Sequence, residues 1–446
     1  MQAEPDHCEQ KIDYARAALW APFYAVGMAA RIQGSPPTEV VKAALSKLQI
    51  LYPPLASRVR VEEDGSAWLT TEGVDEYPLE VRLRTSDDDW ARTFLEQERI
   101  PFDFVCGPVA RFFLLRGDQT SDLMAILPHV VCDGNSMAQV MWDAVALMND
   151  PGRQVTRPLP PPTIDWQTVA HSPFDDLLLR GLVRVVNHAW PNRRVVLSQD
   201  KYEEIHQNYW ARQQHGFISF GLTPAETAGL AARCKQQGVS ISGALMAAFL
   251  LAQNEVRPAM GRTRREITVA VNIRDRVVQN PGRTMGTFAS SIDFIMPPSS
   301  RATFWELARM GHSRIHKSLN NRAQILKPLV MSELDPTIAD NLITSIATDD
   351  MSREIRLFTR FFKVKGESRC LNLSNIGRID LPEAGTPYRL INLLPFPPLV
   401  PGGGMVLNVL TMNSQMNLIL KYRLNKWDSA TVARIRDRAL AYLSGS

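Results

Sequence analysis

A single histidine between a predicted strand and a predicted helix constrains this chain more than any other feature. The apolar run over residues 123–127 predicts a buried strand, and residues 135–148 predict a helix because their apolar side chains recur at helical spacing. The sequence P-H-V-V-C-D-G over residues 128–134 lies between them. Because such junctions hold functional side chains on rigid supports, the pattern predicts a functional site at His129.

His129, Asp133 and Gly134 form the pattern H-x-x-x-D-G. A neutral imidazole is a suitable general base near neutral pH, so His129 is the candidate catalytic residue. Asp133 could orient the imidazole, as in a catalytic triad. Gly134 is expected to let the loop turn sharply, because glycine adopts backbone conformations closed to other residues, and its N–H is a candidate for facing an oxyanion. The motif alone leaves a purely structural histidine open.

Length and composition indicate an ordinary globular protein. A chain of 446 residues predicts two domains or two lobes. The hydrophobic share of 45% and the charged share of 22% are typical of this class, and the formal net charge of +4 is small for the length. The densest basic cluster, Arg262, Arg264 and Arg265, favours a solvated turn over a nucleic-acid site. We therefore expect no nucleic-acid partner.

The five cysteines are far apart in the sequence, and none belongs to a C-x-x-C pair. They predict neither a disulfide framework nor a metal site, and they fit a reducing compartment. The N-terminal residues are acidic and polar, without a basic stretch followed by an apolar core, and no apolar run is long enough to cross a bilayer. We expect a soluble, cytoplasmic protein with no signal peptide and no membrane span.

The predicted elements divide the chain into two lobes. Residues 157–163 are proline-rich and predict a stiff, extended crossing, either a linker or a surface loop within one domain. We assign residues 1–165 to an N-terminal lobe that carries the H-x-x-x-D-G loop, residues 166–210 to a linker or crossing segment, and residues 211–446 to a C-terminal lobe. Both lobes mix helices with strands that look antiparallel, which predicts the α+β class.

Several blocks on either side of the histidine carry further short patterns. They are F-D-x-x-x-G-P-x-x-R at residues 102–111, a helix start at 238–248, N-x-R-x-R at 272–276, M-G-T-F at 285–288 and S-N-x-G at 374–377. In this order, and with the H-x-x-x-D-G motif, they resemble the condensation-domain-like and chloramphenicol-acetyltransferase-like acyltransferase superfamily over nearly the whole chain. The resemblance is strongest to its polyketide-associated and alcohol acyltransferases.

This resemblance implies an α+β fold with two chloramphenicol-acetyltransferase-like lobes in a V, mixed sheets flanked by helices, and an active-site tunnel between the lobes. A thioester donor on a phosphopantetheine arm would enter one end, carried by CoA or by an acyl or peptidyl carrier protein. An alcohol or amine acceptor would enter the other end. No permanently bound cofactor and no metal is implied. The lack of adenylation and carrier domains fits a stand-alone enzyme, which we expect to be a monomer.

The resemblance also implies roles for individual residues. In this superfamily the motif aspartate pairs with an arginine of the second lobe, and Arg274 is the matching residue, with Arg276 as the second choice. Asp133 would then hold the loop and the lobes together, against the alternative that Arg274 is a solvent-facing strand end. Ser374 and Asn375 are candidates for hydrogen bonds to the acceptor or the oxyanion, against the alternative of a strand-end turn.

Two departures from the family pattern keep several functions open. Condensation domains of peptide synthetases carry two histidines in tandem, and Pro128 replaces the first of them; the D-F-G-W-G motif of plant BAHD acyltransferases is absent. The leading hypothesis is a stand-alone enzyme that transfers an acyl group from a thioester to a hydroxyl or amine of a specialised metabolite. The alternatives are a detached, amide-forming condensation enzyme, a non-catalytic docking protein, and a tunnel recruited for cyclisation. The sequence does not identify the acyl chain, the acceptor or the thiol carrier.

Overall fold

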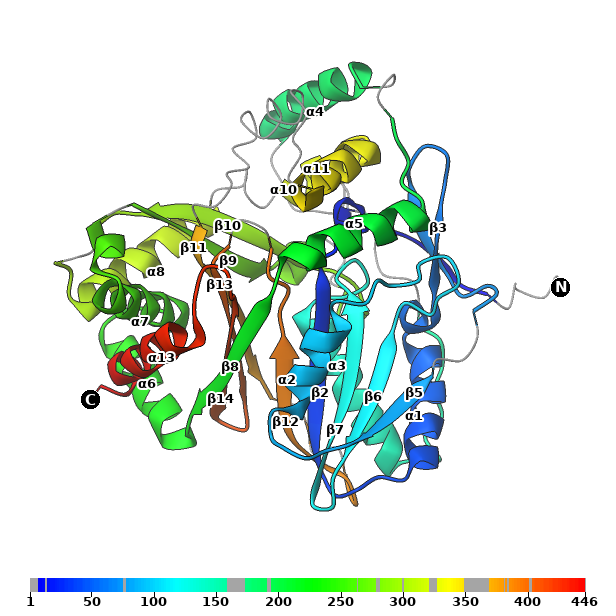
Figure 1. Cartoon of the computed structure of the whole chain (residues 1–446), viewed down its shortest axis with the longest axis horizontal. Coiled ribbons are helices and arrows are strands. Elements are labelled where there is room, and N and C mark those ends of the chain that lie inside the picture. Colours follow the sequence, from blue (N-terminus) through cyan, green and yellow to red (C-terminus); the bar gives the residue numbers. More distant parts are fainter. Residues whose placement is uncertain are drawn as a thin grey trace.

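The protein consists of two lobes, each built on its own β-sheet with helices packed against it (Figure 1). The structure is a computed structural model that describes residues 7–12, 14–74, 78–158, 173–190, 194–262, 264–277, 281–298, 301–320, 327–348, 369–380, 382, 385–400 and 403–445. The predicted α+β class, with mixed sheets flanked by helices, is confirmed. The active-site tunnel between the lobes stays a prediction.

The first lobe contains a five-stranded sheet in the order β12-β2-β7-β6-β5. Its strands are β2 (Ala25–Gln33), β5 (Leu79–Leu83), β6 (Arg111–Arg116), β7 (Thr120–Pro128) and β12 (Arg389–Phe396). The helices of this lobe are α1 (Thr38–Leu51), α2 (Asp89–Gln97) and α3 (Gly134–Asn149). The predicted strand over residues 123–127 lies inside β7, and it is buried throughout because elements cover both faces of this strand.

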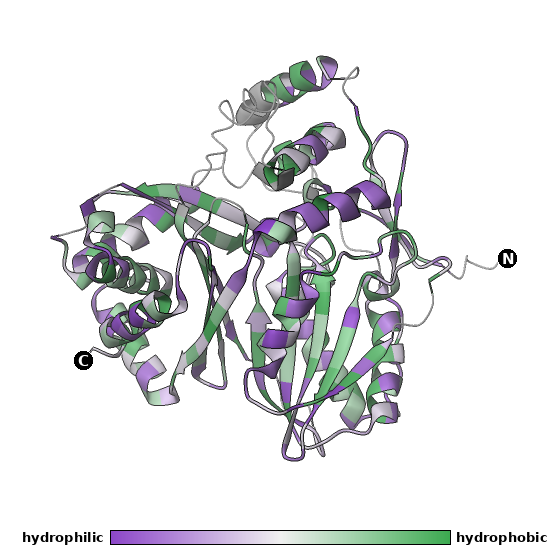
Figure 2. Cartoon of the chain, viewed as in Figure 1, coloured by the Kyte–Doolittle hydropathy of each residue, from purple (hydrophilic) through white to green (hydrophobic). Residues whose placement is uncertain are grey.

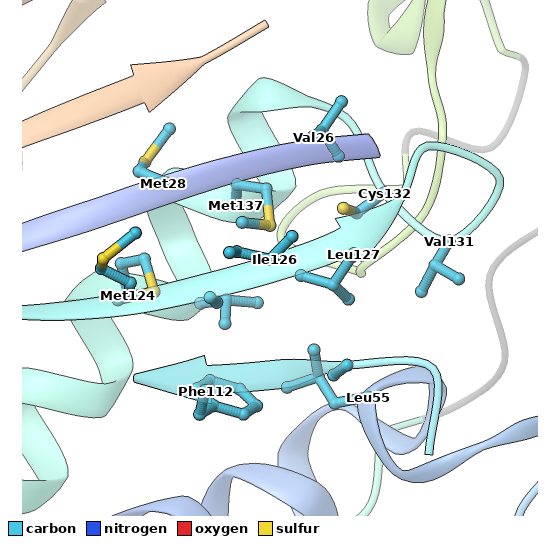
Figure 3. Packing of buried hydrophobic residues seen from close by; sticks show 14 of the residues in the cluster. Val26, Met28, Leu55, Phe112, Met124, Ile126, Leu127, Val131, Cys132 and Met137 are labelled. Atoms are coloured by element: carbon cyan, nitrogen blue, oxygen red, sulfur yellow. The ribbon is translucent and has the colours of Figure 1, made fainter. Parts of the chain in front are cut away.

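An apolar cluster anchors the end of β7 next to the loop that carries the motif. Figure 3 shows Val26 of β2, Ile126 and Leu127 of β7, Met137 of α3 and Cys132 of the loop close together. Each of these side chains is fully or almost fully buried. Protein interiors are packed as densely as organic crystals, so such a cluster allows little movement. The loop therefore begins and ends on a rigid core.

The second lobe contains a six-stranded sheet in the order β10-β9-β11-β13-β14-β8. Its strands are β8 (His215–Leu222), β9 (Arg265–Asn272), β10 (Ala289–Met296), β11 (Arg369–Ile379), β13 (Met405–Met412) and β14 (Gln415–Arg423). Its helices are α6 (Pro224–Gln236), α7 (Ile241–Val256), α8 (Phe304–Asn320) and α13 (Ser429–Ser444). Most strand pairs are antiparallel, as predicted, but β11 runs parallel to both of its neighbours.

Several smaller elements complete the described part of the fold. A three-stranded sheet joins β1 (Glu9–Lys11), β4 (Ala67–Thr70) and β3 (Arg58–Val61). Outside the two sheets lie α4 (Pro173–His188), α5 (Gln199–Arg212), α10 (Lys327–Glu333) and α11 (Pro336–Thr348), with short helical turns η1 (Tyr14–Ala18), η2 (Pro53–Ala56), η4 (Pro258–Arg262) and η5 (Arg274–Arg276). Figure 1 places α4, α10 and α11 together at the top of the molecule.

The hydropathy of the residues differs between the strands of the sheets and the outer helix α5. Figure 2 shows hydrophobic colouring along the strands of both sheets, whereas α5 carries many hydrophilic residues. Among the described residues, no single helix is long and apolar enough to cross a membrane. The helices α6 and α7 meet the length and composition requirement only as a pair, which is bent by 102°.

The two lobes share segments that the predicted boundaries assign to one side. The strand β12 comes from the range 211–446, yet it pairs with β2 in the first sheet. The helix α5 lies mostly in the predicted crossing segment 166–210, and it packs its buried face into the core of the first lobe. The boundaries themselves stay predictions, and most of the proline-rich stretch 157–163 lies outside the described residues.

A buried group of charged side chains also joins the lobes. Glu98 is the C-cap of α2 in the first lobe, and its Oε2 lies 2.5 Å from Nζ of Lys421 on β14. Its Oε1 lies 3.0 Å from Nδ1 of His215 on β8. Although burial opposes ionisation, the charge of Lys421 and the contact with His215 hold the pKa of Glu98 below its usual range. The carboxylate is therefore ionised at neutral pH and depends on its partners.

Replacing Lys421 is expected to destabilise the fold strongly. The variant Lys421→Met leaves the buried Glu98 carboxylate without its main counter-charge and should lower the free energy of unfolding by about 3–5 kcal/mol. The control is Lys201→Met, because Lys201 pairs with Glu204 on the surface and its loss should change the free energy by less than about 1 kcal/mol. Urea unfolding of both variants measures the difference. Equal and small effects would contradict the account.

Candidate active site

The motif loop connects the end of β7 to the start of α3. Asp133 is the N-cap of α3, and its side chain accepts a hydrogen bond from the backbone N of Ser136 at 2.9 Å. At the other end of the loop, the backbone N of His129 donates to the carbonyl of Tyr24, just before β2, at 2.8 Å. One end of the loop is thus fixed by the pairing of β7 with β2, and the other end by a capped helix start.

The imidazole of His129 has a defined orientation and a free reactive nitrogen. Its Nδ1 lies 2.7 Å from the backbone carbonyl oxygen of Cys132. A carbonyl can only accept a hydrogen bond, so Nδ1 carries the proton, and the neutral ring keeps Nε2 as an acceptor. The ring is half-buried and lies edge-on to the Tyr24 ring, with 5.9 Å between centroids. This arrangement suits a general base.

Asp133 does not orient the imidazole but pairs with Arg274 across the lobes. The guanidinium approaches the carboxylate with both terminal nitrogens, Nη1 to Oδ2 at 2.7 Å and Nη2 to Oδ1 at 3.0 Å. The backbone N of Phe288 also donates to Oδ2, at 2.8 Å. Both side chains of the pair are buried, and Arg274 lies in η5, directly after β9. A buried carboxylate with this many hydrogen-bond donors is held firmly in place.

Residues 286–288 of the second lobe clamp the motif loop through further hydrogen bonds. The hydroxyl of Ser136 donates to the carbonyl of Gly286 at 2.8 Å, and the backbone N of Gly286 lies 3.2 Å from the same hydroxyl. The hydroxyl of Thr287 donates to the carbonyl of His129 at 2.7 Å. The second lobe therefore contacts the backbone of the candidate base itself.

The sequence did not single out Ser136 or Thr287 as site residues. Thr287 lies in the M-G-T-F block, and Ser136 stands three residues after Asp133, the spacing of a capped helix start. The sequence around each residue therefore contained a pattern that could have marked it as part of the site. What the sequence could not provide is the approach of the two segments, because they are far apart along the chain.

Gly134 lies close to a side chain of the second lobe, and its predicted part in a sharp turn stays a prediction. Gly134 is the first residue of α3 and is not among the glycines with positive φ. A Cβ at this position would lie 2.9 Å from Cδ1 of Ile376. Ile376 lies at the register shift of β11 between Asn375 and Gly377. The strand of the second lobe thus comes into close contact with the start of α3.

Ser374 and Asn375 lie on β11 near this contact, but no described contact joins them to His129. The side-chain oxygen of Asn375 accepts from the backbone N of Gly377 at 3.0 Å, which is the strand-end turn left open as an alternative. Its side-chain nitrogen lies 3.2 Å from Oγ of Ser242 at the start of α7. Their hydrogen bonds to substrate stay a prediction.

The remaining candidates can be placed as well. Arg276 lies in the same turn as Arg274, and among the described contacts Asp133 pairs only with Arg274. Burial raises the pKa of the Cys132 thiol well above its usual range, with the charge of Asp133 adding to the effect. A protonated thiol is a poor nucleophile, so Cys132 is not a candidate for covalent catalysis. In the part of the chain that the structure describes, no cluster of three or more histidine, cysteine or acidic residues could hold a metal ion.

Comparisons with known proteins agree with the sequence resemblance. The family model described as phthiocerol/phthiodiolone dimycocerosyl transferase C-terminus matches residues 212–392. No curated protein sequence matches the chain significantly.

Solved structures match over almost the whole chain at low sequence identity. Trichothecene 15-O-acetyltransferase TRI3 from Fusarium sporotrichioides has a TM-score of 0.69 at 12% identity, covering 100% of this chain and 96% of that one. Polyketide synthase associated protein 5 from Mycobacterium tuberculosis has a TM-score of 0.62 at 14% identity, with 98% and 97% covered. The condensation domain of the monacolin K polyketide synthase MokA has a TM-score of 0.62 at 12% identity, also with 98% and 97% covered.

Breaking the Asp133–Arg274 pair is expected to destabilise the protein as well as inactivate it. Asp133→Ala leaves the buried guanidinium unpaired and should lower the free energy of unfolding by about 3–5 kcal/mol. Asp380→Ala is the control, because Asp380 pairs with Arg378 on the surface. Its loss should change the free energy of unfolding by less than about 1 kcal/mol. Chemical unfolding measures both. An inactive Asp133→Ala protein with unchanged stability would point instead to a direct catalytic role.

The contact between Gly134 and Ile376 predicts that Gly134→Ala destabilises the protein, although alanine usually stabilises a helix. Alanine is favoured over glycine in helices by about 1 kcal/mol, and Gly181→Ala in α4 should stabilise by up to that amount because no atom lies near its Cβ position. Gly134→Ala should instead destabilise by about 1–3 kcal/mol, since the new methyl group clashes with Ile376. Adding Ile376→Val, which removes Cδ1, should recover part of the loss. Thermal unfolding that shows stabilisation by Gly134→Ala would disprove the steric explanation.

The sequence resemblance to this superfamily is therefore confirmed, and the chain has the fold of the condensation-domain-like and chloramphenicol-acetyltransferase-like acyltransferases.

Proposed function

We propose that this protein is an acyltransferase that moves an acyl group from a thioester to a hydroxyl or amine, with His129 as the general base. The observation that carries the proposal is the hydrogen bond between Nδ1 of His129 and the carbonyl of Cys132. It leaves Nε2 unprotonated and oriented in the neutral ring. A non-catalytic docking protein would have no need of an imidazole held in this tautomer.

The reaction needs only a base and a preactivated acyl group. Nε2 accepts the proton of the acceptor O–H or N–H as that oxygen or nitrogen bonds to the thioester carbonyl carbon. The tetrahedral intermediate then breaks its carbon–sulfur bond, and the imidazolium returns the proton to the departing thiolate. The products are an ester or amide and a free thiol. This route requires no covalent nucleophile on the protein, because the thioester is already activated.

Charge on the tetrahedral oxygen requires hydrogen-bond donors near the reacting carbon. Candidates are the backbone N–H of Gly134 at the start of α3 and the side chains of Ser374 and Asn375 on β11. We place the donor and acceptor in a tunnel between the lobes, because the motif loop lies where segments of both lobes meet. The tunnel would also keep out water, which would otherwise hydrolyse the thioester.

The comparisons favour acyl transfer but not a particular substrate. The description of the matched family model names a dimycocerosyl transferase, and TRI3 is an O-acetyltransferase. We propose acyl-CoA or an acyl carrier protein as the donor, with CoA or phosphopantetheine as a substrate rather than a resident cofactor. The acceptor would be a specialised metabolite, and the enzyme would act as a cytoplasmic monomer.

Removing the imidazole is expected to abolish turnover without unfolding the protein. His129→Ala should lower kcat by about 10²–10⁴-fold, the usual contribution of a positioned general base. His188→Ala is the control, because His188 is exposed on α4 and takes no part in the site. The release of free thiol from acyl-CoA in the presence of an acceptor measures the rate. A cleanly folded His129→Ala protein with a near-normal rate would rule out the assignment and favour a docking function.

The donor class can be tested with the unmodified protein. A panel of acyl-CoAs and acyl carrier proteins is incubated with alcohols and amines, and thiol release is compared with and without each acceptor. We expect release that depends on the acceptor and yields an ester or amide. Activity with a free carboxylic acid and ATP would contradict the proposal, since no nucleotide-binding motif is present in the sequence.

A further inference from the structure

The backbone of His129 is held from both lobes at once. Its N–H donates to the carbonyl of Tyr24, which belongs to the first lobe. Its carbonyl accepts from the hydroxyl of Thr287, at 2.7 Å, and Thr287 belongs to the second lobe. The imidazole then turns back to the carbonyl of Cys132 within the same loop. The position of the ring therefore depends on the peptide group that Thr287 holds.

The hydroxyl of Thr287 can be removed without releasing the segment that carries it. On one side, Gly286 is hydrogen-bonded through both its N–H and its carbonyl to the hydroxyl of Ser136. On the other side, the backbone N of Phe288 donates to the carboxylate of Asp133. Replacing the Thr287 side chain by valine leaves these backbone contacts in place and removes the hydroxyl that donates to the carbonyl of His129.

We propose that Thr287 is a positioning residue that couples the contact between the lobes to the orientation of the His129 imidazole. The hydroxyl of Thr287 fixes the carbonyl of His129, which limits rotation of the peptide group between His129 and Val130. With that peptide group fixed, the ring stays in hydrogen-bond reach of Cys132 and presents Nε2 in one direction. The inference rests on the proposed role of His129 as a base.

A merely structural hydroxyl would have different consequences. It would affect stability but not the rate of the chemical step in the folded enzyme. A positioning role instead predicts a loss in kcat with unchanged substrate binding, because a residue that acts only through the base changes the chemical step and not the binding of the substrate. Rescue by serine separates the hydroxyl from the methyl group of threonine.

The experiment compares Thr287→Val, Thr287→Ser and a matched control in the same lobe. The control is Thr268→Val, because the hydroxyl of Thr268 on β9 donates to Asp293 at 2.7 Å and takes no part in the site. Thr287→Val should lower kcat by about tenfold to a hundredfold, as expected when a reacting group is displaced by a fraction of an ångström to an ångström. The KM values for donor and acceptor should stay within about twofold. Thr287→Ser should recover most of kcat, and Thr268→Val should not alter it.

A second readout does not require activity. In protein labelled with ¹⁵N-histidine, the ring nitrogens of His129 are assigned by comparison with His129→Ala, and their shifts report which nitrogen carries the proton. The parent and Thr287→Ser should show the proton on Nδ1, whereas Thr287→Val should show a mixture of tautomers. If the parent shows the Nδ1 tautomer but transfers no acyl group, the proposed function is wrong. The effect of Thr287→Val on the tautomer then still tests the positioning role.

Three results would overturn the positioning role. One is a Thr287→Val protein with the parent kcat and a single Nδ1 tautomer. Another is a Thr287→Ser protein that is as impaired as Thr287→Val, since the hydroxyl would then not be the reason. The last is a loss that lies in KM alone, which would mean that Thr287 contacts substrate.

Discussion

The pair between the Asp133 carboxylate and the Arg274 guanidinium is the interaction on which the rest of the site depends. Its two halves come from different lobes, one from the cap of α3 and one from the turn after β9. Because both groups are buried, neither can tolerate the loss of the other. The same carboxylate also accepts from Ser136 and Phe288, so it fixes the helix start and residues 286–288 together. A single charged group thus sets the relation between the lobes at the candidate site.

The orientation of the candidate base, His129, depends on this arrangement and not on a carboxylate in contact with the imidazole. In a catalytic triad an aspartate orients the imidazole, but here a backbone carbonyl, that of Cys132, has that task. The carbonyl of Cys132 fixes the ring through Nδ1 and leaves Nε2 for proton transfer. The imidazole can therefore pass its proton on to a departing thiolate. Away from the site, the buried group of Glu98, Lys421 and His215 provides a second link between the lobes.

Local patterns in the sequence predicted the supports of the site well. The strand at residues 123–127 and the helix after it both form, because they depend on neighbouring residues and on spacing. The contact of Asp133 with Arg274 could be expected only from the resemblance to a family. Periodicity says nothing about which distant segments meet.

Features that depend on long-range packing could not be predicted in the same way. The pairing of β12 with β2 in the first sheet and the parallel pairing of β11 depend on the order of strands in the sheets. No local pattern in the sequence indicates that order. The role of Thr287 depends on a contact with a backbone carbonyl, and such an acceptor has no sequence signature. The close approach of Ile376, a residue from the other lobe, to Gly134 likewise has no signal in the local sequence.

A structure of the protein with a non-hydrolysable thioether analogue of acyl-CoA bound tests the central claim most directly. In the proposed mechanism Nε2 of His129 returns a proton to the departing sulfur. The account predicts that the sulfur of the analogue lies about 3–3.5 Å from Nε2, in a passage between the lobes. Nδ1 should still contact the carbonyl of Cys132. An analogue bound away from His129, or an imidazole sealed from any passage that could admit a phosphopantetheine arm, would contradict it.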